Sequence, residues 1–424
     1  MKYSSVKTDI LIIGAGMAGI MAGVAASRQG AKVMIVEMTY TPGGQATSTL
    51  LSEMSGFTLR GEKIYGGIED ELIEHLIHVG SGKHYFNMML SPQSTERVDR
   101  LRYNPEVLKI LLDWFVLDSK IMALGGCRLE SVEEQRDSIR VTVGGGLHNT
   151  EITASILIDA SGDAEATLRA GFDTYRSEEE REVATLLFRL SNVDLDQYEA
   201  FASGGNIKDV IEKGYNLQVL PDKYLSIAPI PGTRDVSVNA TRALVDYDSP
   251  ADITRGIVEA RIQILKIIPF LKNTIPGLQS AALAAMGSVM GMRDGRRILA
   301  ETEVTMDDIL SGRRYFDSVA LGCYPMGAHD PNKEEIEWID AGGIYYIPYS
   351  AMIPLNSKRI IATGKCICCD RMASTSIRCI PVVMNTGEVS GYAAAMAIQK
   401  NLSPAEINVK ELRELLAEKG LNLG

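Results

Sequence analysis

The chain has 424 residues, more than one simple core accommodates, and we expect two domains with one inserted into the other. Its net charge of −11 argues against nucleic acid or an anionic membrane as a partner. It shows no signal-peptide pattern and no apolar run of about 18 residues, so the sequence predicts a cytoplasmic protein without a membrane span.

The first motif follows a short apolar run near the start of the chain. Residues 10–13 lack polar alternation, which suits a parallel strand buried on both faces. They lead into the sequence GAGMAG, a GxGxxG turn. Gly14 permits a tight strand-to-helix turn, Gly16 leaves room for a pyrophosphate, and Gly19 lets the helix lie close to the strand.

The segments after this turn support a dinucleotide site. A helix over residues 18–29 points its N-terminus at the pyrophosphate. A second buried strand, residues 32–36, ends at Glu37, whose carboxylate suits ribose hydroxyls and disfavours the 2′-phosphate of NADP. The residues expected to contact the cofactor here are Gly14, Ala15, Gly16, Met17, Ala18, Gly19, Glu37 and Met38.

Two further glycine-containing turns are also suited to bring the backbone close to a ligand. Gly43 and Gly44 follow Pro42 in a tight loop with exposed backbone donors, and Gln45 comes next. After three short strands that predict a β-meander (128–135, 138–143 and 147–153), a buried strand over 155–159 ends in ASGD. Its Ala160, Gly162 and Asp163 would approach the ligand, and Asp163 could accept a hydroxyl or cap the next helix.

This order of motifs resembles the glutathione-reductase-type FAD-binding fold. More narrowly, it is similar to the FAD-dependent oxidoreductase family related to fumarate reductase flavoproteins and thiazole-forming flavoproteins. The resemblance implies an α/β fold: a Rossmann-like FAD-binding domain with a parallel sheet and a β-meander, plus an inserted smaller α+β substrate domain. It also implies that the glycine turns hold the FAD pyrophosphate and that Glu37 holds the adenosine ribose.

The C-terminal part of the chain extends the resemblance. A last buried strand over 358–362 ends in ATGK, which is similar to the family's GR motif, although Lys365 replaces the usual arginine. Residues 384–391 lead into a helix that runs to about 397 and corresponds to the family's C-terminal helix, with its N-terminus at the flavin pyrimidine. The contacts implied are Gly364, Asn385, Thr386 and Gly387.

The pattern of predicted strands and helices changes between these two parts of the chain. Strand candidates over 184–190, 224–229 and 235–241 precede a long helix over 251–272 with apolar residues at helical spacing. We therefore expect the FAD-binding domain in residues 1–171 and 351–424 and the inserted substrate domain in residues 172–350.

Three residues are candidates for catalysis. Arg293 belongs to the run MRDGRR, which is either a solvated basic turn or a functional segment that supplies an anion clamp or a flavin-facing guanidinium. His329 lies in a turn-rich loop that in the family carries a histidine near the substrate. An imidazole that titrates near neutral pH could transfer a proton there, although a loop histidine bonded to the backbone is the alternative. Arg378 is a second guanidinium that could orient an anionic group.

The clustered cysteines could form a metal-binding site, but we do not favour this interpretation. Cys366, Cys368 and Cys369 lie close together, but their spacing matches no standard cluster, and reduced thiols are the preferred interpretation. No histidine follows the second glycine loop closely and Gln45 offers no attachment, so we expect FAD to bind non-covalently.

The sequence favours hydride transfer between flavin N5 and a small polar substrate, a hydroxy acid or a sugar-like alcohol. A second GxGxxG is absent, so a built-in NAD(P)H domain is not expected and an external electron acceptor is needed. Two alternatives remain open: a flavin-dependent monooxygenase, and an electron-transfer or redox subunit in which the cysteines matter more.

Overall fold

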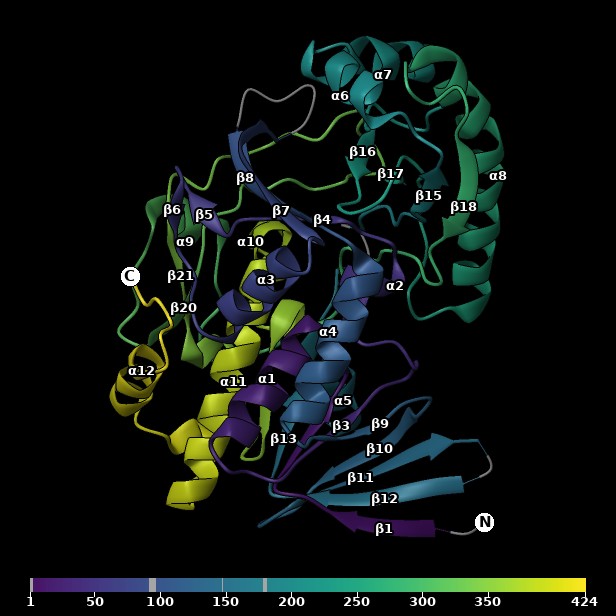
Figure 1. Ribbon diagram of the computed structural model, residues 1–424. Helices are drawn as coiled ribbons and strands as arrows, with labels where there is room; N and C mark the ends of the chain where they lie inside the picture. Colours follow the sequence, from purple (N-terminus) through teal and green to yellow (C-terminus); the bar gives the residue numbers. More distant parts are fainter. Residues whose placement is uncertain (1–2, 91–96, 147, 178–180) are drawn as a thin grey trace.

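The computed structural model describes residues 3–90, 97–146, 148–177 and 181–424 (Figure 1). A parallel sheet of five strands lies at its centre, with every strand paired in parallel. In spatial order the strands are β22 (Ile360–Ala362), β13 (Ile156–Asp159), β2 (Ile10–Ile13), β3 (Val33–Val36) and β9 (Met122–Leu124). All residues of β2, β3, β13 and β22 are buried, which explains their unbroken apolar runs.

Each face of this sheet is covered by a different layer. On one face, Ile10 and Ile12 share a core with α1 (Met17–Arg28) and α11 (Ile380–Lys400), which are flanked by α3 (Ile68–His78) and α4 (Pro105–Asp118). On the other face, Leu11 and Ile13 pack against an antiparallel meander. The meander consists of β10 (Arg128–Glu134), β11 (Ile139–Gly145) and β12 (His148–Ala154), and β1 (Tyr3–Lys7) pairs in parallel with β12. The mixed α/β class, the parallel sheet and the meander are as the sequence predicts.

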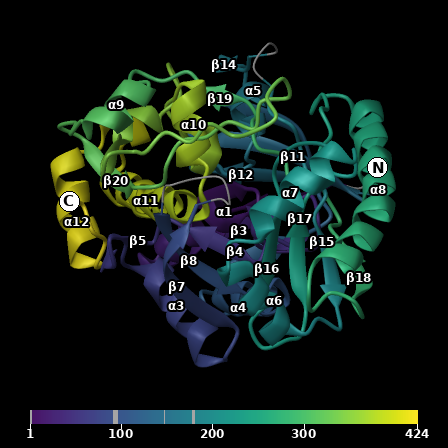
Figure 2. The same ribbon diagram turned by 90° about the horizontal axis from the view of Figure 1, so that it is seen from above.

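A second hydrophobic core lies beside the first. Its antiparallel sheet has the order β16 (Ser226–Pro229), β17 (Val236–Asn239), β15 (Phe188–Ser191) and β18 (Ala282–Met286). Figure 2 shows the long helix α8 (Pro250–Thr274) along the outer side of this sheet, and α6 (Leu195–Ser203) and α7 (Ile207–Asn216) complete the layer. The buried residues of this core run from Ala184 to Met290.

Residues after the second core return to the first. Buried apolar residues from Ile298 to Ala351 belong to the core that contains α1 and α11. The domain boundaries at 172 and 350 therefore stay a prediction.

The remaining elements are α2 (Gln45–Ser48), α5 (Glu165–Arg169), α9 (Met306–Ser311), α10 (Arg371–Ile377), α12 (Val409–Glu418), β4 (Glu53–Ser55), β5 (Thr58–Leu59), β6 (Glu62–Lys63), β7 (Gly82–Met89), β8 (Arg97–Tyr103), β14 (Thr174–Tyr175), β19 (Arg297–Ile298), β20 (Ser318–Gly322) and β21 (Tyr345–Pro348), with 3-10 turns at Tyr349–Ala351, Gly364–Cys366 and Pro404–Glu406.

Across the described ranges, none of the helices combines the length and the apolar character that crossing a bilayer requires.

Candidate functional site

A cavity of about 570 Å³ opens at the carboxyl ends of four adjacent parallel strands. The residues that follow β2, β3, β13 and β22 all line it, namely Gly14, Glu37, Ala160, Ser161, Gly162, Asp163, Thr363, Gly364 and Lys365. Residues of the second core, such as Leu187 and Asn239, close its other side. Ligands of open α/β sheets bind at this edge.

The first glycine turn has the geometry of a phosphate cradle. Gly14 has φ +103°, and a Cβ there would lie 2.5 Å from the carbonyl oxygen of Ala160. A Cβ on Gly19 would lie 1.9 Å from the carbonyl oxygen of Gly14, so this glycine allows the helix to approach the strand as expected. A Cβ on Gly16 would meet no atom within 4 Å, and Gly16 lines the cavity. No side chain caps α1, so its first N–H groups are available to an anion.

Glu37 joins this turn to the next segment. Its Oε2 accepts a hydrogen bond from the backbone nitrogen of Ala15 at 2.8 Å, and its Oε1 accepts from the backbone nitrogen of Thr39 at 2.8 Å. The carboxylate also lines the cavity. Oε1 accepts a second hydrogen bond from Thr39 Oγ1 at 2.9 Å, so Oε2 is the oxygen that keeps a lone pair for a ribose hydroxyl. Met38, by contrast, is 63% exposed and does not line the cavity, and its cofactor contact stays a prediction.

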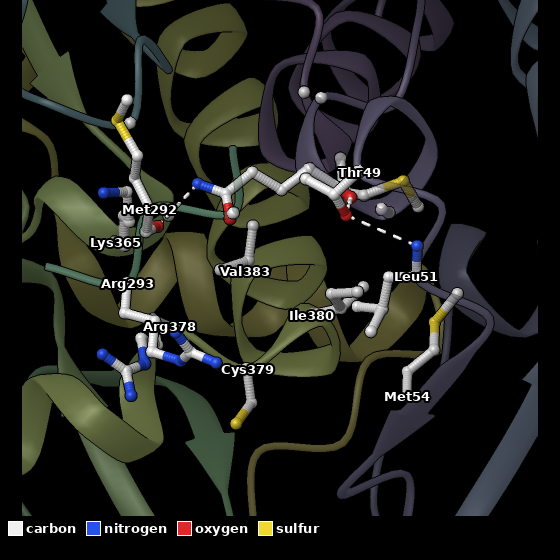
Figure 3. A pocket seen from close by; sticks show the side chains of 18 of the residues that line it. Thr49, Leu51, Met54, Met292, Arg293, Lys365, Arg378, Cys379, Ile380 and Val383 are labelled. Carbon is white, nitrogen blue, oxygen red and sulfur yellow. Dashed lines mark hydrogen bonds between the residues drawn. The ribbon is translucent and has the colours of Figure 1, made fainter. Parts of the chain in front are cut away.

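The second glycine loop lies against the first. The backbone nitrogen of Gly43 donates to the carbonyl oxygen of Ala15 at 2.8 Å, and Gly43 forms a β-bridge with Gly16. Both Gly43 and Gly44 line the cavity. Gln45 lines it as well, but its amide donates to the carbonyl oxygen of Met292 at 2.7 Å, one of the contacts dashed in Figure 3.

Asp163 has a partner that the sequence does not reveal. Its Oδ1 accepts from the backbone nitrogen of Arg296 at 2.7 Å, and its other oxygen pairs with the guanidinium of Arg296. Burial raises the pKa of Asp163, and the nearby Lys365 and Arg296 oppose that shift. Asp163 does not cap α5, because Ser161 Oγ accepts from the backbone nitrogen of Glu165 at 3.0 Å.

The C-terminal helix begins earlier than the sequence predicts. Helix α11 starts at Ile380, with Pro381 in its first turn, so its N-terminus does reach the cavity. The lining residues at this end are Cys379, Ile380 and Val383, all labelled in Figure 3.

The three residues predicted to contact the cofactor on this helix lie inside α11, and their cofactor contacts stay a prediction. Asn385 Oδ1 accepts from the backbone nitrogen of Leu321, and Thr386 Oγ1 accepts from the backbone nitrogen of Gly364. A Cβ on Gly387 would lie 2.3 Å from the carbonyl oxygen of Ala18. Gly387 thus serves close helix packing, and none of the three lines the cavity.

The far end of the cavity holds a buried charged cluster. The guanidinium of Arg378 forms two hydrogen bonds with the carboxylate of Glu182, and Glu182 also accepts from the backbone nitrogen of His329 at 2.7 Å. Glu182 is only 2% exposed, and Arg378 holds its pKa below the usual range against the effect of burial. The sequence did not single out Glu182, since it directly follows a charge run typical of a solvated loop.

His329 lines this end, but its surroundings oppose the titration expected near neutral pH. Its ring lies 5.3 Å from that of Tyr224, edge to face. Burial lowers the pKa of His329 well below its ordinary value, and Arg293, Arg242 and Arg378 lower it further. The imidazole is therefore neutral at pH 7, and it is suited to accept a proton rather than to donate one.

The three arginines of the MRDGRR run have different surroundings. Arg293 donates to the carbonyl oxygen of Val183 at 2.5 Å, and burial together with Arg242 and Arg378 lowers its pKa to about 10. Arg296 forms ion pairs with Asp163 and Asp248, and Arg297 is buried with its guanidinium 5.4 Å from the ring centre of Tyr175. Only Arg293 of the three lines the cavity, so the run is not simply a solvated turn.

The clustered cysteines lie in the core rather than around a common ligand. Cys366, Cys368 and Cys369 are buried, and burial raises the pKa of each thiol. Cys366 Sγ accepts from the backbone nitrogen of Ala164 at 3.3 Å. Among the residues that the structure describes, no three His, Cys, Asp or Glu side chains are grouped as metal ligands.

The parallel sheet, the glycine turns at its edge and the acid after β3 together define a dinucleotide-dependent enzyme of the Rossmann type. The sequence model of the family described as FAD dependent oxidoreductase matches residues 9–416, and the chain belongs to this family. The protein is therefore an FAD-dependent oxidoreductase, and the cradle formed by Gly14, Gly16, Gly43 and Glu37 fits this cofactor.

Known structures resemble the chain at low sequence identity. A geranylgeranyl bacteriochlorophyll reductase-like protein from Thermoplasma acidophilum is 14% identical with a TM-score of 0.52, and the match covers 98% of this chain and 84% of that one. The flavin-dependent brominase Bmp2 is 13% identical (TM-score 0.49, 97% and 83% covered). The p-nitrophenol 4-monooxygenase PnpA from Pseudomonas putida DLL-E4 is 10% identical (TM-score 0.48, 98% and 85% covered). A search of curated proteins found no match. These similarities concern the fold alone.

Proposed function

We propose that this enzyme transfers hydride between flavin N5 and a small polar substrate, a hydroxy acid or a sugar-like alcohol. The observation that carries the proposal is the continuity of the cavity. It runs from the glycine turns that fit FAD to a compartment lined by Arg293, His329 and Arg378. When bound, FAD supplies the two-electron acceptor or donor.

The residues of this compartment have separate roles in the proposal. The neutral imidazole of His329 accepts the hydroxyl proton of an alcohol substrate as its carbon is oxidised. Arg293 orients an anionic group of the substrate. Arg378 is occupied by Glu182, and Glu182 in turn holds the backbone of His329, so we assign Arg378 a positioning role. We expect FAD to be bound without a covalent link.

Anaerobic mixing of the holoenzyme with hydroxy acids and sugars tests the proposal. A substrate that bleaches the flavin absorbance without any other protein supports it. Oxygen uptake with incorporation of an oxygen atom into the substrate would instead indicate the monooxygenase alternative. Reduction by a protein donor only would indicate the electron-transfer alternative.

Replacement of the proposed base gives the first prediction. His329→Gln should slow flavin reduction at least about 100-fold, because a positioned base contributes roughly that factor or more. His148→Gln, at an exposed histidine of β12, is the matched control and should leave the rate unchanged. Equal rates for His329→Gln and the unsubstituted enzyme would remove His329 from the proton transfer.

A further inference from the structure

Arg293 differs from the arginines around it. Arg378 pairs with Glu182, Arg242 pairs with Asp222 at 2.6 Å, and Arg100 pairs with Glu53 at 2.9 Å. In the described part of the chain, Arg293 forms no ion pair, and its guanidinium donates a hydrogen bond to the carbonyl oxygen of Val183. Glu182, which pairs with Arg378, compensates the charge of Arg293 only in part. Burial of a partly compensated cation is costly, so a ligand that neutralises it binds favourably.

Other groups near Arg293 also offer hydrogen-bond donors to the cavity. Asn239 Oδ1 accepts from Thr185 at 2.9 Å and from Arg242 at 3.2 Å, which leaves its amide nitrogen free to donate. The hydroxyls of Tyr224 and Tyr324 make no hydrogen bond to a described residue, and both tyrosines line the cavity. The carboxylates here, in contrast, already accept from arginines. The compartment therefore suits a ligand rich in acceptors.

We propose that the compartment binds its substrate through a carboxylate and that Arg293 is the anchor. This inference rests on the proposed function. Of the two substrate classes proposed there, it favours the hydroxy acid over the sugar-like alcohol. A carboxylate accepts two parallel hydrogen bonds from a guanidinium, which a sugar hydroxyl does not. It also compensates the positive charge contributed by Arg293 beside Arg242 and Arg378.

The other walls of the compartment indicate the rest of the substrate. The ring of Tyr224 stands edge to face against that of His329, 5.3 Å away, and Leu51, Met54 and Leu187 line the same cavity with apolar side chains. The rings of Tyr324 and Trp338 also line it and stand edge to face, 6.2 Å apart. Apolar and aromatic walls favour an apolar or aromatic body. A carboxylic acid with such a side chain satisfies both parts of the compartment.

Anion binding to the oxidised holoenzyme tests this inference without turnover. Mandelate, benzoate and acetate are the anionic probes, and mandelamide is the neutral counterpart of mandelate. Dissociation constants come from the perturbation of the flavin spectrum and, independently, from calorimetry. We expect mandelate to bind at least tenfold more tightly than mandelamide, and benzoate more tightly than acetate. A failure of all three anions to bind would overturn the proposal.

Substitutions assign the effect to Arg293. Arg293→Met should weaken mandelate binding at least tenfold and leave mandelamide binding unchanged, while Arg293→Lys should recover part of the loss. Arg255→Met, on the outer helix α8, is the control and should bind like the unsubstituted protein. FAD content and circular dichroism verify that each variant is folded, and the lysine variant keeps the test valid if the methionine variant does not fold. Equal weakening for mandelate and mandelamide would contradict the anchor role.

A second anion, reduced flavin, could also use Arg293. Arg293→Met would then lower the flavin reduction potential and leave mandelate binding intact, which would overturn the proposal. Failure of the proposed hydride transfer is distinguishable, because mandelate would bind through Arg293 while no hydroxy acid bleached the flavin.

Discussion

The properties of single residues in this protein depend on neighbours that are distant in the sequence. His329 is neutral because it is buried and because arginines from three other segments lie near it, and the buried Glu182 pairs with Arg378. Arg293 and His329, which the sequence singled out because a histidine or an arginine in a turn-rich segment is a plausible site residue, line the cavity, and their catalytic roles stay a prediction. The shift of the His329 pKa could not be predicted, because it arises from the tertiary arrangement of charges.

A buried acid outside the cavity has a measurable effect on stability. Glu388 of α11 is 1% exposed, and its Oε2 accepts from the backbone nitrogen of Ile68 at 3.0 Å. Burial raises its pKa to about 8 from the ordinary value of 4.5. Between these pH values the folded protein holds a proton that the unfolded chain releases, so the free energy of unfolding falls as the pH rises.

The second prediction follows from this dependence of the free energy of unfolding on pH. Glu388 should lower the free energy of unfolding, measured with urea, as the pH rises from 5 to 8, and Glu388→Gln should remove this contribution. Glu69 adds a slope of the same sign and His329 a slope of the opposite sign, so the slopes of the variant and the unsubstituted protein are compared. Gln399→Ala, at the end of the same helix, should keep the full slope. A slope unaffected by Glu388→Gln would show that another group causes it.

At the scale of elements, strands were easier to predict than the start of the last helix. The runs that form β2, β3 and β22 are short and wholly apolar, and that of β13 is apolar up to its last residue, Asp159, a pattern with few other structural solutions. The start of α11 was placed too late because a glycine in a small-residue segment resembles a turn. In the structure Gly387 and Gly391 instead allow α11 to approach Ala18 and Ala22 of α1.

The third prediction concerns this helix contact. Within a helix, glycine to alanine normally stabilises by about 1 kcal/mol. Gly387→Ala should have the opposite sign and destabilise by roughly 1–3 kcal/mol, because the new Cβ would meet the backbone of α1. Urea unfolding measures the change, with Gln399→Ala as the control on α11. Stabilisation by Gly387→Ala would show that the two helices separate without cost.

At the scale of the whole molecule, the cavity joins the two hydrophobic cores. It is lined by the edge of the parallel sheet and by residues of the second core, and Ser237 Oγ of that core donates to the carbonyl oxygen of Leu50 at 2.6 Å. The change in the pattern of predicted strands and helices indicated a second structural unit between the two cofactor-binding segments. The return of Ile298–Ala351 to the first core was not predictable, because these residues join it through tertiary contacts.

The fourth prediction is that FAD stabilises the molecule as a whole. A ligand at 100 times its dissociation constant adds about 2.7 kcal/mol to the free energy of unfolding. Removal of FAD should therefore lower the melting temperature in calorimetry, and ADP, which lacks the flavin, should restore only part of it. Complete restoration by ADP would mean that the flavin end of the cavity contributes no binding energy.

The pairing of β22 with β13 and the packing of α11 on α1 also constrain the order of events during protein synthesis. The cofactor cradle begins at Gly14, but the strand and the helix that complete it follow more than 340 residues of chain, since β22 begins at Ile360. A nascent chain on the ribosome thus carries an incomplete cradle until the last segments emerge. We therefore expect full affinity for FAD only after β22 and α11 have emerged.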